Sequence, residues 1–100
     1  MEAGADANKA DDIGFTPLHM AAQEDQEAVV KVLLEAGADA NTATTFGYEV
    51  TALHLAAQNG HLAVVKALLE AGADANRASL NGSTPLQMAV LGGHLAVVKT

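Results

Sequence analysis

The sequence predicts an all-α solenoid, a stack of similar turn-helix-helix units that follow one another along the chain. The first observation behind this prediction is a block that begins at residues 16, 51 and 84, so that its copies are 35 and 33 residues apart. The second is the segment Glu-Ala-Gly-Ala-Asp-Ala-Asn, which occupies residues 2–8, 35–41 and 70–76. Self-similarity at a fixed period of roughly 20 to 50 residues is the signature of a repeat architecture.

The third observation is the kind of apolar residue that the chain contains. Half of the 100 residues are hydrophobic, but only Phe15, Phe46 and Tyr48 are aromatic, and Ala, Leu and Val dominate. Small side chains let helices approach closely, and stacked units that contact only their neighbours can bury a continuous core made from them. We therefore expect one folded domain over residues 1–100.

The charge balance excludes several classes of function. Twelve acidic residues against five basic ones give a net charge of −7, and no basic cluster lies beside aromatic residues, so nucleic acid is a poor partner. No apolar stretch approaches the roughly 18 residues of a membrane span, and the N-terminal residues lack the pattern of a signal peptide. Without cysteine, neither a disulfide nor a zinc-thiolate site can form. We expect a soluble, intracellular (cytoplasmic) protein without membrane insertion.

Residues 1–10 are predicted to be the tail of a preceding repeat. The two later copies of the tail follow an apolar run with helical spacing, so Gly4, Gly37 and Gly72 stand where a helix ends in the left-handed conformation. The first copy has lost nearly all of its helix.

The first full repeat is predicted over residues 11–43. It starts with a projecting turn at residues 11–15, after which Thr16 caps a short helix whose first position is Pro17. A break at residues 23–26 separates this helix from a second one, in which Val and Leu recur at helical spacing until Gly37 ends it.

The second repeat, residues 44–78, has the same plan and two more residues. Residues 47–51 stand where the first repeat has only residues 14–16, so the insertion is predicted to lie in the projecting turn. The third repeat, residues 79–100, stops inside its second helix, without the paired leucines and the glycine that end the others.

Three motifs recur in phase along the chain: Thr-Pro-Leu-His at residues 16–19, Gly-His-Leu at residues 60–62 and 93–95, and Gly-Ala-Asp in each tail. From residue 4 to residue 100 the chain resembles the ankyrin repeat family. The resemblance implies a curved solenoid whose turns and first helices line a concave face. In that family the concave face binds other proteins and the repeats are not expected to be enzymes, so no catalytic residue and no cofactor are implied.

The resemblance also implies which residues contact a partner protein. They are the exposed positions of the turns and the exposed end of each first helix. The turn residues are Asp12, Ile13, Phe15, Thr45, Phe46, Tyr48, Glu49, Val50, Leu80, Asn81 and Ser83. The first-helix ends are Gln23, Glu24, Gln58, Asn59, Leu91 and Gly92.

Three positions depart from the family pattern. Asp25-Gln26 replaces the Gly-His pair of the other two copies, so the first repeat turns there without glycine, at a cost of about 1 kcal/mol. Such a turn can be shifted or mobile. Gln87 replaces the histidine of the first-helix block and Ala52 replaces its proline, and neither change is expected to abolish the fold.

All three aromatic residues fall in the predicted turns and none in the predicted helices. With Ile13, Val50 and Leu80 nearby, they could form an apolar strip of the kind that marks partner sites. The alternative is that they fold back over the backbone of their own turn. The sequence favours partner contact and leaves both interpretations open.

The histidines have a metal-binding and a structural interpretation. His19 and His54 occupy the same place in successive repeats, but no carboxylate or cysteine lies at ligand spacing beside the histidines. The resemblance implies instead that this histidine forms local hydrogen bonds that tie the turn to the first helix. No metal site is predicted.

Acidic residues concentrate near the predicted concave side and the first interhelix turn. They could steer a basic partner to the face, or simply keep the chain soluble, and the sequence weighs these about equally. The residues are Asp11, Asp12, Glu24, Asp25, Glu27 and Glu49.

These features predict a non-catalytic module that binds a partner protein of unknown identity. No phosphate-binding loop, nucleophile elbow or pair of catalytic carboxylates is present. One alternative is a segment that self-associates head to tail, because residues 79–100 and 1–10 supply 22 and 10 residues, one short of a 33-residue unit. A cut from a longer array explains the ends more plainly, and the near-identical tails favour a third possibility, a designed ankyrin binder.

Overall fold

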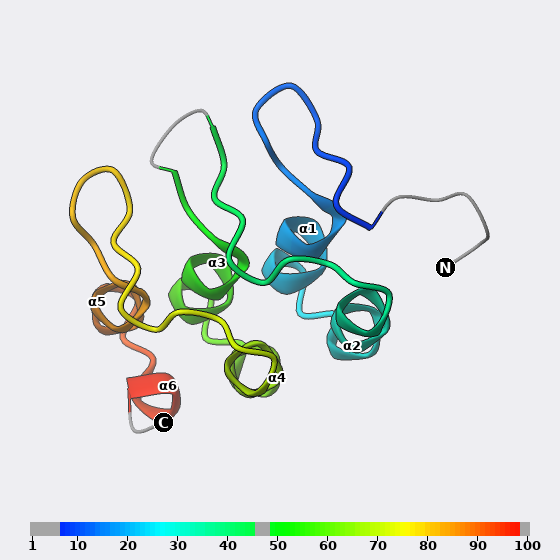
Figure 1. Ribbon diagram of the computed structural model, residues 1–100. Coiled ribbons are helices and arrows are strands. Elements are labelled where there is room, and N and C mark those ends of the chain that lie inside the picture. The colour runs from blue at the N-terminus through cyan, green and yellow to red at the C-terminus, as the bar shows by residue number, and fades with distance from the viewer. Residues whose placement is uncertain (1–6, 46–48, 99–100) are drawn as a thin grey trace.

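Helices in two rows make up the chain, with long turns projecting beyond one of the rows (Figure 1). The computed structural model describes residues 7–45 and 49–98, and in these ranges every regular element is a helix. The first helices of the repeats form one row: α1 (Pro17–Gln23), α3 (Ala52–Gln58) and α5 (Pro85–Leu91). The second helices form the other: α2 (Glu27–Glu35), α4 (Leu62–Glu70) and α6 (Leu95–Val98). This is the predicted all-α solenoid.

Each first helix begins at a threonine, as the sequence predicts. The side chain of Thr16 accepts a hydrogen bond from the backbone N–H of His19, and the Thr16 N–H donates to Nδ1 of the same histidine at 3.0 Å. Thr51 and Thr84 form the same reciprocal cap with the residue three positions on. Because these pairs satisfy N–H groups that a helix start leaves free, a first helix of seven residues has a fixed beginning.

The core is a continuous layer of Leu, Val and Ala side chains between the two rows. Leu18, Leu53 and Leu68 are its largest fully buried members, and Val30 and Val64 pack with them. Alanines fill the places where helices of neighbouring repeats approach, so the small-residue composition becomes a core that extends from repeat to repeat.

Asparagine side chains join the tails of successive repeats. Asn8 donates from Nδ2 to the carbonyl of Gly37 at 3.1 Å and accepts from the N–H of Asp39 at 2.7 Å. Asn41 makes the same pair of bonds to Gly72 and Asp74, at 3.2 and 2.6 Å. Asn8 therefore makes the same bonds to the tail of the first repeat as Asn41 makes to the tail of the second, while the assignment of residues 1–10 to a preceding repeat stays a prediction.

The first interhelix turn keeps the geometry of the other two, although it has no glycine. Asp25 adopts a φ of 58°, close to the 73° of Gly60 and the 72° of Gly93. The following residue, Gln26, donates its N–H to the carbonyl of Ala21 at 2.9 Å, as its counterparts do in the later repeats. The turn is thus not shifted. Asp25 adopts the left-handed conformation that glycine has in the other two repeats, and aspartate tolerates this conformation better than most residue types.

The predicted two-residue insertion falls in the second projecting turn, whose residues 46–48 lie outside the described residues, and it stays a prediction. The three turns are closed by equivalent hydrogen bonds, from Asp11 N–H to Phe15 O, from Thr44 N–H to Val50 O and from Ser79 N–H to Ser83 O. The left-handed position before the closing residue is Gly14 or Gly82 in the outer turns, with φ of 80° and 86°, and is Glu49 in the middle one, with φ of 54°.

Candidate functional site

The turns present most of their implied contact residues to solvent. Leu80 is 66% exposed and Ile13 is 45% exposed, which are large fractions for apolar side chains. Their neighbours on the turns are polar and exposed as well, so the tips form an accessible surface. The exposed turn residues are Asp12, Ile13, Thr45, Glu49, Leu80 and Asn81.

Val50 and Ser83 are half-buried, although the sequence implied exposed positions. Each closes its turn, and each offers its carbonyl to a histidine of the preceding repeat. Phe46 and Tyr48, which belong to the same predicted surface, lie outside the described residues.

Phe15 folds back onto its own repeat. Its ring stacks on that of His19, with 5.2 Å between ring centroids and 26° between the planes, and the side chain is half-buried. The Asp11 carboxylate fixes this turn by accepting the N–H groups of Ile13 and Phe15 at 3.0 and 2.9 Å. For this aromatic residue the structure therefore shows the alternative that the sequence left open, intramolecular packing.

The ends of the first helices are exposed in all three repeats. Gln23 and Gln58 are exposed, and Leu91, at the same position in the third repeat, is 82% exposed. Between α3 and α5 the surface is hollowed by about 290 Å³. Five residues line this hollow: Gln58, Asn59, Met88, Leu91 and Gly92. Four of them belong to the implied contact set, so the structure brings these four together.

His19 and His54 each join two repeats. The Thr16 N–H donates to His19 Nδ1, so the proton of the neutral ring is on Nε2, which donates to the carbonyl of Val50 at 3.1 Å. His54 donates in the same way to the carbonyl of Ser83 at 3.0 Å. The resemblance implied the local cap, and the structure adds a bond to the next repeat. Burial lowers the pKa of both imidazoles below the ordinary value of 6.5, against the opposing effect of the carbonyls that accept from Nε2.

A second pair of histidines reaches backwards along the solenoid. His61 donates from Nε2 to the carbonyl of Gln23 at 3.0 Å, and His94 donates to that of Gln58 at 2.8 Å. These bonds use carbonyls at the ends of α1 and α3, where a helix leaves such groups without intrahelical partners. Within residues 7–45 and 49–98, no three His, Cys, Asp or Glu side chains form a group that could hold a metal ion.

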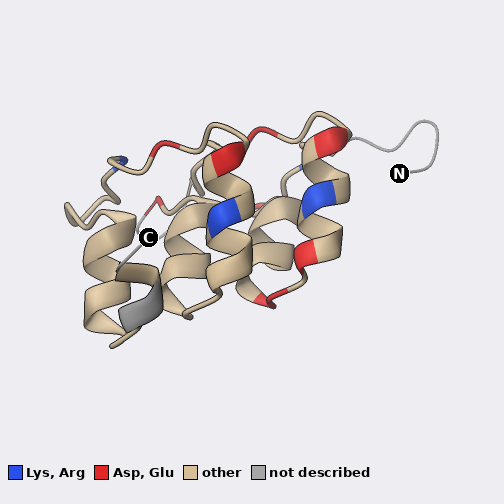
Figure 2. Cartoon of the chain, turned by 90° about the horizontal axis from the view of Figure 1, so that it is seen from below, with Lys and Arg blue, Asp and Glu red and all other residues tan. Residues whose placement is uncertain are grey.

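Charged residues avoid the first helices. The sequences of α1, α3 and α5, all of them described, contain no Asp, Glu, Lys or Arg. The exposed bases Lys31 and Lys66 lie on α2 and α4, among the blue bands of Figure 2. Of the acids near the first repeat, Glu27 pairs with Lys31 at 2.9 Å and Asp25 lies 3.7 Å from His61.

Among the described helices, none is long and apolar enough to cross a bilayer.

A family model for ankyrin repeats in many copies matches residues 21–69 and 53–100, which together span four fifths of the chain. The chain belongs to the ankyrin repeat family. Its units, each with a helix pair, a capping threonine and a projecting turn, are thus ankyrin repeats that stack as the sequence predicted. No curated protein sequence matches the chain significantly.

Ankyrin repeats generally mediate protein–protein interaction, and the family is typically non-catalytic. Protein binding is therefore the general role that family membership gives to this chain.

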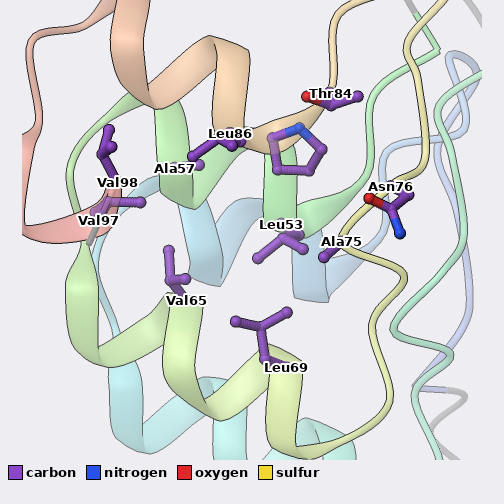
Figure 3. Close-up of a pocket in the computed structure, with 11 residues that line it drawn as sticks. Leu53, Ala57, Val65, Leu69, Ala75, Asn76, Thr84, Leu86, Val97 and Val98 are labelled. Atoms are coloured by element: carbon purple, nitrogen blue, oxygen red, sulfur yellow. The ribbon is translucent and has the colours of Figure 1, made fainter. Parts of the chain in front are cut away.

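Two features of the ankyrin stack were missed at the level of sequence. One is Met88, whose equivalents Met20 and Leu55 could have drawn attention to it as an apolar residue beside the first-helix end. The other is an apolar pocket of about 300 Å³ at the far end of the stack (Figure 3). Its lining includes Leu53 and Ala57 of α3, Val65 and Leu69 of α4, Leu86 of α5, and Val97 and Val98 of α6.

Proposed function

We propose that this chain is a non-catalytic module that binds another protein through a face made of its turns and its first-helix ends. The observation that carries the proposal is that the first-helix ends are exposed in all three repeats, and that the described turns expose Asp12, Ile13, Thr45, Glu49, Leu80 and Asn81. Asp12 and Leu80 share one turn position, and both are exposed. Ile13 and Asn81 share the next, and both are exposed as well.

Leu91 gives the strongest support for this face. Its equivalents Gln23 and Gln58 are exposed in repeats that have neighbours, so the exposure of Leu91 does not arise from its place in the last repeat. A leucine side chain that stays in water after folding contributes no buried apolar surface to the stability of the fold. It does provide an apolar contact for a partner, and it lines the hollow between α3 and α5.

The proposed face is chemically polarised along the stack. Asp12 and Glu24 are exposed at the first repeat, whereas Leu80, Met88 and Leu91 make the surface of the third repeat apolar. We therefore propose that the partner places an apolar side chain in the hollow and a basic segment over the first repeat. Acidic groups on one side of a binding face raise the encounter rate with a basic partner.

The experiment compares the Kd of the wild type with the Kd of a variant of the proposed face, each measured with the same isolated partner protein. Proteins retained by the immobilised chain are purified, and the Kd of each is measured with purified components. The face variant is Leu80→Asp/Leu91→Gln, because aspartate and glutamine are the residues that the first repeat carries at these two positions. We expect this variant to bind at least about tenfold more weakly, as for the loss of apolar anchors at an interface.

Lys66→Gln is the matched control, since Lys66 is exposed on α4, in the row of second helices. The control should keep the wild-type Kd. Equal binding by the face variant and the wild type, or an equal loss in the control, would place the partner on another surface. The intracellular location stays a prediction, which imaging of a tagged chain in cells would test.

A further inference from the structure

One end of the stack exposes apolar positions that are buried in every repeat with a following neighbour. Leu86 is 53% exposed, whereas Leu18 and Leu53, at the same position of α1 and α3, are 2% exposed. Val90 is 59% exposed, and its equivalents Ala22 and Ala57 are almost completely buried. We call Leu86 and Val90 the C-face, and Leu86 also lines the pocket of Figure 3.

The opposite end exposes the positions that face a preceding repeat. Val29 is 45% exposed, whereas its equivalent Val64 is 0% exposed. Val32 is 48% exposed, and its equivalent Ala67 is buried. Met20 of α1 is 59% exposed and its equivalent Leu55 is half-buried. We call Met20, Val29 and Val32 the N-face, and it lies at the other end of the rows from α5 and α6 (Figure 1).

We propose that the C-face of one molecule binds the N-face of a second copy of this chain, in the register in which successive repeats pack inside one molecule. The chain itself shows that the two kinds of surface fit. Inside the chain, the positions of the first repeat that are equivalent to the C-face pack against the positions of the second repeat that are equivalent to the N-face. This contact buries Leu18, Ala22 and Val64. Within the chain, Leu18 and Ala22 of α1 pack towards α3. In the proposed contact, Leu86 and Val90 of α5 in one copy would pack in the same way against α1 of the next copy.

Two further observations point to a second copy as the occupant. The helices α5 and α1, which would meet, contain no Asp, Glu, Lys or Arg, and the same holds for α1 and α3 where they pack within the chain. No such charge is therefore desolvated between α5 and α1. The Asn8 side chain already ties residues 7–10 to Gly37 and Asp39 in the position of a repeat tail. A helix pair stacked in front of α1 would continue this arrangement, and α5 and α6 of another copy are such a pair.

The two faces differ from each other and lie at opposite ends, so the interface is heterologous. Such an interface builds open chains or closed rings of copies and not a two-fold dimer. Because each copy has a net charge of −7, long-range repulsion opposes the contact, and added salt should strengthen it.

The test measures mass by light scattering behind size-exclusion chromatography, from micromolar to millimolar protein. The C-face variant is Leu86→Glu/Val90→Glu, and the N-face variant is Met20→Glu/Val32→Glu. All four side chains are at least 48% exposed, so the variants should fold, which circular dichroism checks. The wild type should exceed 10.2 kDa increasingly with concentration and with salt, while each variant alone should stay at the monomer mass.

The decisive sample is an equimolar mixture of the two variants. Each variant keeps the one face that the other has lost, so the mixture should form one-to-one dimers of about twice 10.2 kDa and nothing larger. Leu80→Asp/Leu91→Gln, outside both faces, should associate as the wild type does. A wild type that stays monomeric at millimolar concentration, a mixture that stays monomeric, or a Leu80→Asp/Leu91→Gln variant that loses association would each overturn the proposal.

Discussion

The middle repeat and the two repeats beside it share one plan, yet the same positions have different surroundings in them. Leu53 in α3 is enclosed by helices on both sides, whereas Leu86 in α5 has a neighbour on one side only. Leu91 and Gln58, in contrast, are exposed in either setting. The comparison teaches that exposure in a repeat protein has two origins, and that only positions open in every repeat indicate a face meant for a different partner.

The largest expected effect comes from truncating the same leucine in both settings. Leu53→Ala removes a fully buried side chain, so it should lower the free energy of unfolding by about 3 kcal/mol. Leu86→Ala should cost less than about 1 kcal/mol, because half of that side chain is in water already. Urea denaturation at low micromolar protein, where copies do not associate, measures both values. Equal losses at the two positions would break the comparison.

The interhelix glycines offer a second contrast between the middle and the end of the stack. Gly60 and Gly93 have nearly the same φ, but a Cβ at Gly60 would lie 2.5 Å from His94 Nδ1, whereas one at Gly93 meets nothing within 4 Å. Gly93→Ala should therefore cost only the strain of a left-handed alanine, about 1 kcal/mol, and Gly60→Ala about 2 kcal/mol, because the His94 ring must also move. Thermal unfolding of both variants measures the difference, and a larger loss in Gly93→Ala would contradict the packing described at Gly60.

The histidine that joins two repeats should make stability depend on pH. Burial lowers the pKa of His19 and His54 below 6.5, so the unfolded chain binds more protons than the folded one near pH 6. Stability should be complete above about pH 7 and fall as the pH drops through 6.5. His54→Gln should keep the cap, as Gln87 does by accepting from Thr84 N–H at 2.8 Å, and lose the bond to Ser83. We expect a loss of about 1 kcal/mol at pH 7.5 and a weaker pH dependence, from urea titrations at several pH values. An unchanged pH profile would show that the buried ring is not the titrating group.

The smallest effect is expected at the first interhelix turn. Asp25→Gly should stabilise the chain by about 0.5 to 1 kcal/mol, because glycine adopts the left-handed backbone of this turn without strain. The Asp25 carboxylate lies 3.7 Å from Nδ1 of His61, partly in water, and the two form an ion pair only when the histidine is protonated, so the loss of this contact offsets little of the gain. A destabilised Asp25→Gly variant in thermal unfolding would mean that the carboxylate matters more than the backbone.

The sequence was sufficient to predict the architecture, because each repeat contains its own helix-capping residue and its own pattern of apolar positions. Thr16, Thr51 and Thr84 cap a first helix wherever they recur. The backbone of Asp25 could not be predicted in the same way. The sequence left a displaced turn open, whereas the structure has a left-handed aspartate with the Gln26 N–H bonded to the carbonyl of Ala21.

The candidate face was harder to predict than the fold. Side chains such as Ile13 and Leu91 follow from their repeat positions, but Phe15 turns back onto His19 through a contact that no spacing in the sequence encodes. The hollow beside Met88 also depends on how far α3 and α5 are apart, which is a property of the stack and not of any one repeat. The end faces likewise become visible only when burial is compared between equivalent positions.

The most direct test of the proposed face is an NMR titration of the labelled chain with a purified partner, at a protein concentration below the onset of self-association. We expect chemical-shift changes concentrated at Ile13, Leu80, Asn81 and Leu91, and near-constant shifts along α2 and α4. Changes concentrated on α2 and α4, with the turns and first-helix ends unaffected, would contradict it.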